Sequence, residues 1–199
     1  MSIDSATPSQ KGQNLLAFYR AGKEIPEDDY READIRNTNC SGLELRHHDL
    51  MRLNAQKAIL NKAKIVHCNL HQANFQYCQL QQATLSFSNI DGGRLGGCKG
   101  PDASFQQSSL RSSKFQRAVL WRANFQLSSL AYADLSGADL RWADLRGCNL
   151  QNSNLQGASL IGAVINQQTI ENSNWGDIEQ QDLIARGAIW HPASVQHTV

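Results

Sequence analysis

The sequence lacks the features by which several common protein classes are identified. Near the N-terminus the longest apolar run is LLAF at 15–18, too short for a signal-peptide core or a membrane span. The five cysteines are odd in number and include no CxxC pair, so neither a disulfide framework nor a cysteine zinc site is indicated. We therefore expect a cytoplasmic chain whose cysteines serve as small apolar core residues.

Motifs of catalysis are missing as well. The sequence contains no GxSxG, no HExxH and no cysteine–histidine pair at a recognisable spacing. The glycine-rich stretch at 91–102, DGGRLGGCKGPD, lacks the Lys-Ser/Thr step and the following helix of a phosphate-binding loop. The only metal-like cluster, which no carboxylate or cysteine obviously joins, consists of His47, His48, His67 and His71. The sequence thus predicts a protein that is not an enzyme and that has no metal site and no cofactor.

Acidic residues are scarce in the middle of the chain. Residues 1–50 carry 6 basic and 9 acidic side chains, and residues 131–199 carry 3 and 7. Residues 51–130, which we call the basic waist, carry 10 basic side chains against only Asp91 and Asp102. The formal net charge of +1 therefore conceals a basic middle between two acidic ends.

The sequence does contain a strict five-residue repeat. In ADLSGADLRWADLRGCNLQNSNLQGASL (133–160), leucine recurs at every fifth position, two residues after Ala, Cys or Ser. From Tyr30 to Trp175, 25 of the 30 residues at multiples of five are Leu, Ile or Phe, and the frame never slips. Of the 30 residues two positions earlier, 25 are Ala, Ser, Cys, Gly or Thr. This period fits neither a helix, with about 3.6 residues per turn, nor a strand, with about two.

The pentads ADLSG (133–137), ADLRW (138–142), ADLRG (143–147) and ANFQL (123–127) resemble the pentapeptide repeat family, and the resemblance covers about three quarters of the chain. It implies an all-β repeat solenoid: a right-handed quadrilateral parallel β-helix with four pentads per coil, which gives about 7–8 coils stacked like parallel strands. Backbone geometry agrees, because positions two apart in extended chain face the same way, so the small residue and the pentad centre both point inward. The last two residues then turn a corner, where glycine recurs at Gly42, Gly92, Gly97, Gly137, Gly147, Gly157 and Gly162.

Each end of such a shaft needs a cover, because a terminal coil exposes a sheet edge and a section of the core. We expect a disordered tail over 1–12, an N-terminal capping helix within 13–27, the β-helix over 28–177, and a C-terminal capping helix with its tail over 178–199. The residues predicted to cover the two ends are Leu15, Leu16 and Tyr19, and Ile184, Ile189 and Trp190, respectively.

Two departures from the repeat predict local irregularity. Leu43 and His48 overfill positions that usually hold a small residue, so the first two coils should be wider or less regular. Gly100 replaces a large pentad centre and precedes Pro101, which cannot donate a ladder hydrogen bond. We expect one side of the coil to bulge at 98–102.

The resemblance implies a function in binding, since known activities in the family are mostly protein–protein. The first hypothesis is a rigid, non-catalytic bacterial scaffold, a monomer or an end-to-end homodimer, that binds a protein partner through flat faces. An alternative is the role of the family's quinolone-resistance proteins, which resemble duplex DNA and engage DNA gyrase; such a mimic should be acidic, whereas the waist is basic. A third hypothesis is nucleic-acid binding by the waist, but its charges fall on several outward columns and no groove-reading element is present. We expect neither nucleic acid nor a membrane as the partner.

The candidate protein-binding residues are Trp121, Arg122, Tyr132, Arg141 and Trp142. Trp is unusual at the turn positions of a solvated shaft. A twenty-residue coil places Trp121 beside Arg141 and Arg122 beside Trp142, which predicts two reciprocal cation–π contacts between coils. Tyr132 is expected on the next corner round, extending the patch. Since Trp, Tyr and Arg commonly anchor interfaces, this corner is either a binding surface or a reinforcement of coil stacking.

Overall fold

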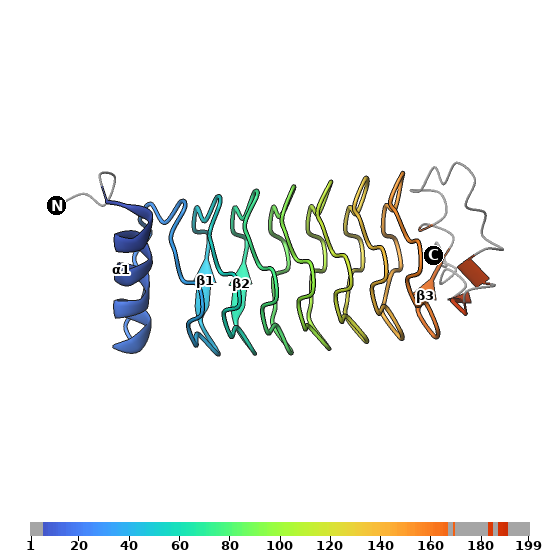
Figure 1. The fold of residues 1–199 in the computed structure, drawn as a ribbon, viewed down its shortest axis with the longest axis horizontal. Coiled ribbons are helices and arrows are strands. Elements are labelled where there is room, and N and C mark those ends of the chain that lie inside the picture. Colours follow the sequence, from blue (N-terminus) through green and yellow to red (C-terminus); the bar gives the residue numbers. More distant parts are fainter. Residues whose placement is uncertain (1–5, 167–168, 170–182, 185–186, 191–199) are drawn as a thin grey trace, which may run out of the picture.

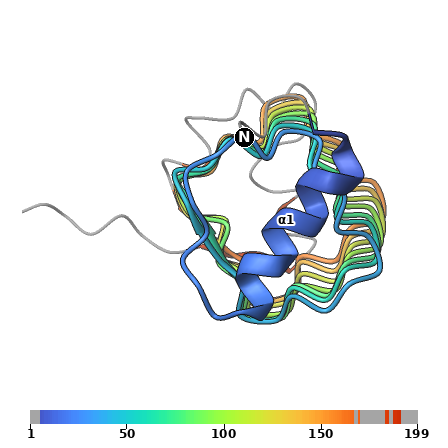
Figure 2. The ribbon, with the colours of Figure 1, turned by 90° about the vertical axis from the view of Figure 1, so that its left-hand side faces the viewer.

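The chain winds into coils of twenty residues that stack along one axis. In the computed structural model, which describes residues 6–166, 169, 183–184 and 187–190, the outward residue of each pentad pairs in parallel with the residue twenty positions later, as Asn54 does with Asn74. Figure 1 shows the resulting shaft from the side, and Figure 2 shows it end-on as a ring with four corners. The right-handed quadrilateral β-helix predicted from the five-residue period is confirmed.

Strands longer than a single bridge occur only near the ends of the described shaft. Strand β1 (Glu44–Arg46) pairs with β2 (Lys64–Val66), and β3 (Val164–Ile165) pairs with β4 (Ile189–Trp190), both in parallel. Single bridges continue the same ladder between them. Its rungs are Glu44, Lys64, Thr84, Ser104, Asn124, Asp144, Val164 and Ile189. At a strand spacing of about 4.8 Å, these eight rungs span about 34 Å.

The corners of the coils are built from left-handed backbone. The second residue of each turn from Glu32 to Gly162 has a positive φ, between 53° and 62° where it is not glycine. In most turns the N–H that follows donates back across the corner, as Ala123 does to the carbonyl of Leu120 at 3.0 Å. This is the turn position at which glycine avoids a steric cost, so the predicted corner glycines are confirmed. The side chain at this position projects away from the shaft.

One corner of the first coils is less regular, and His48 lies at it, as predicted. At Leu43 the corner is regular, since its N–H donates to the carbonyl of Cys40 at 3.1 Å, so the prediction for Leu43 is wrong. Among the described hydrogen bonds, the turns at 45–48, 65–68 and 85–88 lack the bond across the corner. The N–H of Cys68 instead donates to Ser88 Oγ at 3.1 Å. His48 itself is buried and its Nε2 lies 3.1 Å from the carbonyl oxygen of Pro26. The altered corner continues at Cys68 and Ser88, which are small residues, so the size of His48 alone does not account for it; the ladder itself is unbroken.

The inward positions fill the shaft with apolar side chains. All five cysteines are buried free thiols, as predicted, and burial raises the pKa of Cys78 to about 12. In the middle coils Phe105 and Phe125 stack with ring centroids 5.0 Å apart, and Phe115 meets Phe105 edge-on at 5.9 Å. The core is therefore continuous along the axis, with each coil packed on the next.

The bulge predicted at residues 98–102 is absent, so that prediction is wrong. Lys99 pairs with both Gln79 and Val119, and the N–H of Gly100 donates to the carbonyl of Val119 at 2.8 Å. Pro101 occupies the first position of a corner, where the neighbouring coils use no N–H in the backbone ladder, so it removes no ladder bond. A Cβ built on Gly100 would lie 3.3 Å from side-chain atoms of Leu80, Ala103 and Leu120, so the neighbours already fill the space.

The N-terminal capping helix begins earlier than predicted. Helix α1 spans Pro8–Arg20, so residues 8–12, assigned above to a disordered tail, are helical. The signal was a capping box: Thr7 Oγ1 accepts from the N–H of Gln10, and Gln10 Oε1 accepts from the N–H of Thr7. Pro8 stands at the first helical position, where its missing N–H costs nothing. The chain leaves the helix through Gly22, whose φ of 61° is left-handed.

Helix α1 lies across the open end of the first coil, as Figure 2 shows. Leu15 and Leu16 are buried, and Tyr19 Oη donates to the carbonyl of Ser41 at 2.8 Å. The approach is closest at Gly12, where a Cβ would lie 2.0 Å from the carbonyl oxygen of Asp34. Beside it Lys11 Nζ forms an ion pair with Asp29 at 2.7 Å. These contacts cover the first sheet edge and the core beneath it.

At the far end the described residues close part of the last coil. Leu183 and Ala188 are buried, whereas Ile184 and Ile189 are 44% and 49% exposed, so the prediction that the two isoleucines cover the core is wrong. The N–H of Ile189 pairs with the carbonyl of Ala163 at 2.7 Å. The remainder of the predicted C-terminal helix, the side chain of Trp190, the predicted tails and the repeats predicted after residue 169 lie outside the described residues. Within the described part of the chain, no helix has the length and apolar character needed to cross a membrane.

Candidate functional surfaces

Two tryptophans and two arginines from adjacent coils gather at one corner of the shaft. Trp121, Arg122, Arg141 and Trp142, which we call the Trp corner, line a hollow of about 350 Å³. Trp142 is 59% exposed and Trp121 is half-buried. The indole of Trp142 lies over Gly162, where a Cβ would come within 2.4 Å of the ring. The twenty-residue spacing therefore brings these four predicted residues together.

The contacts within the Trp corner differ from those predicted. The guanidinium of Arg122 lies 4.4 Å from the ring centroid of Trp121, its neighbour in sequence, and not over Trp142. It also donates two hydrogen bonds of 2.7 Å to the carboxylate of Asp102 in the preceding coil. Arg141 is held by Asp139 with Nη2–Oδ2 at 2.7 Å, and these hydrogen bonds lower the pKa of Asp139. The predicted pair of reciprocal cation–π contacts between coils is wrong, because bidentate carboxylates within reach fix both guanidiniums elsewhere.

Tyr132 does not extend the Trp corner. Turns at 126–127 and 131–132 follow the one at 121–122, so Tyr132 lies two corners on, at the diagonally opposite corner of the ring. It is 51% exposed, and the guanidinium of Arg111 lies 5.7 Å from its ring centroid. The prediction of the next corner was a miscount of the turns.

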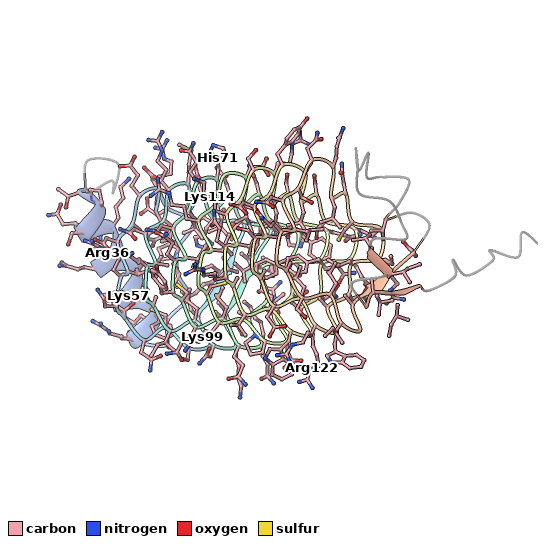
Figure 3. All side chains as sticks on the ribbon, turned by 45° about the vertical axis from the view of Figure 1, so that its right-hand side comes forward. Arg36, Lys57, His71, Lys99, Lys114 and Arg122 are labelled. Carbon is pink, nitrogen blue, oxygen red and sulfur yellow. The ribbon has the colours of Figure 1, made fainter. Side chains whose placement is uncertain are left out.

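The histidines do not assemble into a metal site. His47 and His67, which are twenty residues apart, stack with ring centroids 5.1 Å apart, and Phe87 continues the stack at 4.8 Å from His67. His48 points into the core, and His71 lies on another corner (Figure 3). Within the part of the chain that the structure describes, no three His, Cys, Asp or Glu side chains could share a metal ion. The rings stack because residues twenty positions apart lie above one another in adjacent coils.

The cations of the basic waist fall on several outward columns, as predicted, and most of them lie on two adjacent faces. The outward column of the shaft's second face, which pairs from coil to coil, is Asp34, Asn54, Asn74, Arg94, Lys114, Asp134 and Asn154. Six of the ten waist cations lie on this face or its two corners: Arg52, Lys57, Arg94, Arg111, Lys114 and Arg117. Figure 3 labels two of them, Lys57 and Lys114, together with Lys99 of the third face. The third face and its two corners hold five waist cations, of which Lys57 and Arg117 are shared with the second face: Lys57, Lys62, Lys99, Arg117 and Arg122. The waist is therefore basic mainly on two adjacent faces.

A groove of about 550 Å³ runs along this second face. Its lining residues, which we call the basic groove, are Arg52, Asn54, Gln72, Asn74, Gly92, Arg94, Ser112 and Lys114. Reasoning from the sequence missed it because it summed charges along the chain. Residues taken at steps of twenty reveal the groove. In the corner column the large side chains of Arg52 and Gln72 are followed by the small residues Gly92 and Ser112. In the same two coils the column of the second face holds Arg94 and Lys114.

Comparisons with known proteins agree with this architecture. Residues 58–135 match the family model described as pentapeptide repeat region, and residues 138–173 match pentapeptide repeats (8 copies). A search of curated proteins gives no significant match. Among solved structures, a trypsin-treated variant of QnrB1, a plasmid-mediated fluoroquinolone resistance protein, is 12% identical with a TM-score of 0.51 and covers 79% of this chain and 89% of its own.

A second solved structure extends over nearly the whole of its own chain. The pentapeptide repeat protein Rfr23 from the cyanobacterium Cyanothece 51142 is 17% identical with a TM-score of 0.46, covering 82% of this chain and 98% of its own. At 12% identity, the QnrB1 structure is similar to this chain in fold alone. The two family matches together cover more than half of the sequence. The chain belongs to the pentapeptide repeat family.

Proposed function

We propose that this chain is a non-catalytic scaffold that binds a protein partner at the Trp corner. The observation that carries the proposal is the hollow lined by Trp121, Arg122, Arg141 and Trp142. Trp and Arg are the residue types that most often dominate the binding energy of protein interfaces. Because Arg122 and Arg141 are already held by carboxylates, little side-chain freedom remains to be lost on binding.

A purely structural role for the Trp corner would be favoured if its rings were buried between coils. Trp142 instead leaves 59% of its surface exposed, although its ring lies on the backbone at Gly162. An exposed indole on a fixed support offers apolar area that only a partner can remove from water. This supports binding over reinforcement of the stack.

The test is a double substitution, Trp121→Ser with Trp142→Ser. The tagged chain is used to capture proteins from its native host, and the captured protein is then purified and titrated against both forms. We expect the double variant to weaken that purified complex by about a hundredfold, since two interface anchors are removed. The melting temperature of the free chain should change little.

The matched control is Tyr77→Ser with Leu127→Ser, which removes two equally exposed corner residues elsewhere on the shaft, 58% and 47% exposed in the native chain. Binding that survives in the control and not in the tryptophan variant supports the proposal. A large loss of stability in the tryptophan variant with capture intact would leave the corner a structural role only.

Gyrase protection by DNA mimicry is an alternative that the charge of the basic waist does not support. A mimic of duplex DNA needs acidic surface along the shaft, and residues 51–130 hold ten cations against two carboxylates. A supercoiling assay with ciprofloxacin tests it directly. We expect no rescue of gyrase at low micromolar concentrations of this chain.

A further inference from the structure

The basic groove on the second face has a surplus of donors that the protein itself does not use. We propose that it binds a short acidic segment of a protein, an extended run of Asp or Glu side chains. This site is separate from the Trp corner, which belongs to the corner after the third face, and the inference does not depend on the function proposed for that corner.

The charge arrangement in the groove reverses the one found elsewhere on the shaft. In other pentads an aspartate in the outward column holds the arginine two residues later, with Asp34–Arg36 at 2.7 Å and Asp144–Arg146 at 2.6 Å. In the groove that outward position is occupied by a cation, Arg94 or Lys114. Neither forms an ion pair with any carboxylate among the residues that the structure describes. Lys114 does attract Asp134, its neighbour in the next coil, but not at ion-pair distance. The charge of Arg94, and that part of the charge of Lys114 which Asp134 does not balance, is therefore available to a ligand.

Arg94 and Lys114 also lie directly opposite each other in adjacent coils. Like charges in this position repel and destabilise a sheet. An acidic residue at one of the two positions would stabilise the shaft by forming an ion pair. Lys64 forms such a pair with Glu44 of the preceding coil, with Nζ–Oε1 at 2.7 Å. An anion seated between Arg94 and Lys114 would relieve the repulsion. The guanidinium of Arg94 has the planar geometry that matches a carboxylate.

The rest of the groove is lined by side chains that can donate hydrogen bonds. The side-chain carbonyl of Asn54 accepts from the Asn74 amide at 3.3 Å, and that of Asn74 accepts from the N–H of Gln76 at 3.1 Å. Because the carbonyl oxygens are occupied in this way, amide N–H groups remain for a ligand. Gly92 and Ser112 keep the adjoining corner low, which gives a ligand access to the two cations.

The length of the groove favours an acidic peptide over nucleic acid. From Asn54 to Lys114 the column rises three coils, about 14 Å, which matches about four residues of extended peptide. Beyond it, Asp34 and Asp134 end the column with negative charge. A helical turn of duplex DNA is about 34 Å long, so its phosphates would meet these carboxylates. None of the groove's lining residues is aromatic, so single-stranded bases would find no stacking platform there.

The experiment measures binding of a fluorescein-labelled hexaglutamate peptide by fluorescence anisotropy at low salt. The test variant is Arg94→Gln with Lys114→Gln. The matched control is Lys62→Gln with Lys99→Gln, which removes two exposed cations from the third face and its corner, also without ion pairs among the described residues. We expect the test variant to weaken binding by about tenfold or more and the control by less than about threefold, with affinity falling as salt rises.

Two probes separate the other ligands. Unlabelled hexathymidylate and inorganic phosphate are added as competitors at equal charge concentration, and we expect both to compete at least about tenfold less well than unlabelled hexaglutamate. Equal losses in the two double variants would overturn the proposal, because binding would then reflect diffuse charge. Stronger competition by hexathymidylate would overturn it in favour of nucleic acid. Both variants are first checked for a cooperative melting transition, since exposed substitutions should leave the fold intact.

Discussion

The inward and outward positions of the shaft follow the same five-residue period and yet carry different kinds of information. Inward centres are almost uniform, with Leu, Ile or Phe at 25 of 30. The outward corner column through Trp121 holds nearly every chemical type: Ser41, Asn61, Gln81, Pro101, Trp121, Arg141 and Ile161. Cavity and overpacking costs restrict the interior, whereas an exposed corner requires only a residue that tolerates its backbone. Stability should therefore depend on the inward set and binding on the outward set.

The largest effect should come from the phenylalanine cluster of the middle coils. Phe115 is fully buried and meets Phe105 and Phe125 edge-on at 5.9 and 6.0 Å. We expect Phe115→Ala to lower the free energy of unfolding by about 2–5 kcal/mol, because it leaves a cavity in a packed core. The exposed change Gln81→Ala should cost less than about 0.5 kcal/mol. Urea denaturation of both variants is the measurement, and equal costs would refute the division into inward and outward positions.

A smaller effect is expected where helix α1 meets the first coil. Gly12→Ala places a Cβ where the carbonyl of Asp34 now lies, so the helix must move outward. We expect a loss of about 1–3 kcal/mol, typical of overpacking, although Gly→Ala ordinarily stabilises a helix. Light scattering should also show association of the variant as the sheet edge is exposed. The exposed neighbour Gln13→Ala serves as the control, and a stabilised, monomeric Gly12→Ala would contradict the observed contact.

The ion pair beneath α1 predicts a pH dependence of the same junction. Hydrogen bonds from Arg31, with Lys11 adding to them against the effect of burial, hold the pKa of Asp29 well below its ordinary value of 3.8. A lowered pKa in the folded state means that the stabilisation is complete above 3.8 and is lost as the pH falls below it. Thermal unfolding followed from neutral to acid pH should therefore show a steeper loss for the native chain than for Asp29→Asn. Parallel curves would show that Asp29 plays no part.

The smallest effect should have the opposite sign. Arg94→Gln with Lys114→Gln removes two like charges that face each other across adjacent coils, so we expect the free chain to gain a few tenths of a kcal/mol. Raising the salt concentration should narrow that gain, because the repulsion is exposed to solvent. A melting curve at two salt concentrations measures it. A clear loss of stability would mean that these cations support the fold. Outward positions at this site would then contribute to stability as inward positions do.

Much of the fold could be predicted because the same pattern of inward and outward residues recurs in every pentad. The coil of twenty residues, the inward cysteines and the corner glycines all follow from the period and from backbone geometry. The start of helix α1 is not predicted by the apolar pattern, which begins only at Leu15; the capping box at Thr7 is the feature that marks it. The bulge at Gly100 was wrongly expected because the N–H that Pro101 lacks is not needed at that corner.

Less of the candidate sites could be predicted. The sequence placed Trp121, Arg122, Arg141 and Trp142 in their columns, and their gathering around one hollow is confirmed. It could not give the partner of each guanidinium, since Asp102 and Asp139 compete with the indoles through short-range geometry. Nor did charge counting along the chain reveal the basic groove, whose lining residues come from several coils.

By itself the sequence determined the solenoid, because a five-residue alternation of small and large apolar residues can bury both only by turning a corner after each pentad. It thereby also determined which residues lie above one another. Tertiary structure alone decided which carboxylate holds which arginine and how closely Gly12 approaches the first coil. The physical reason is range: burial follows from a pattern read along the chain, whereas ion pairs and close contacts depend on side-chain positions to within an ångström or so.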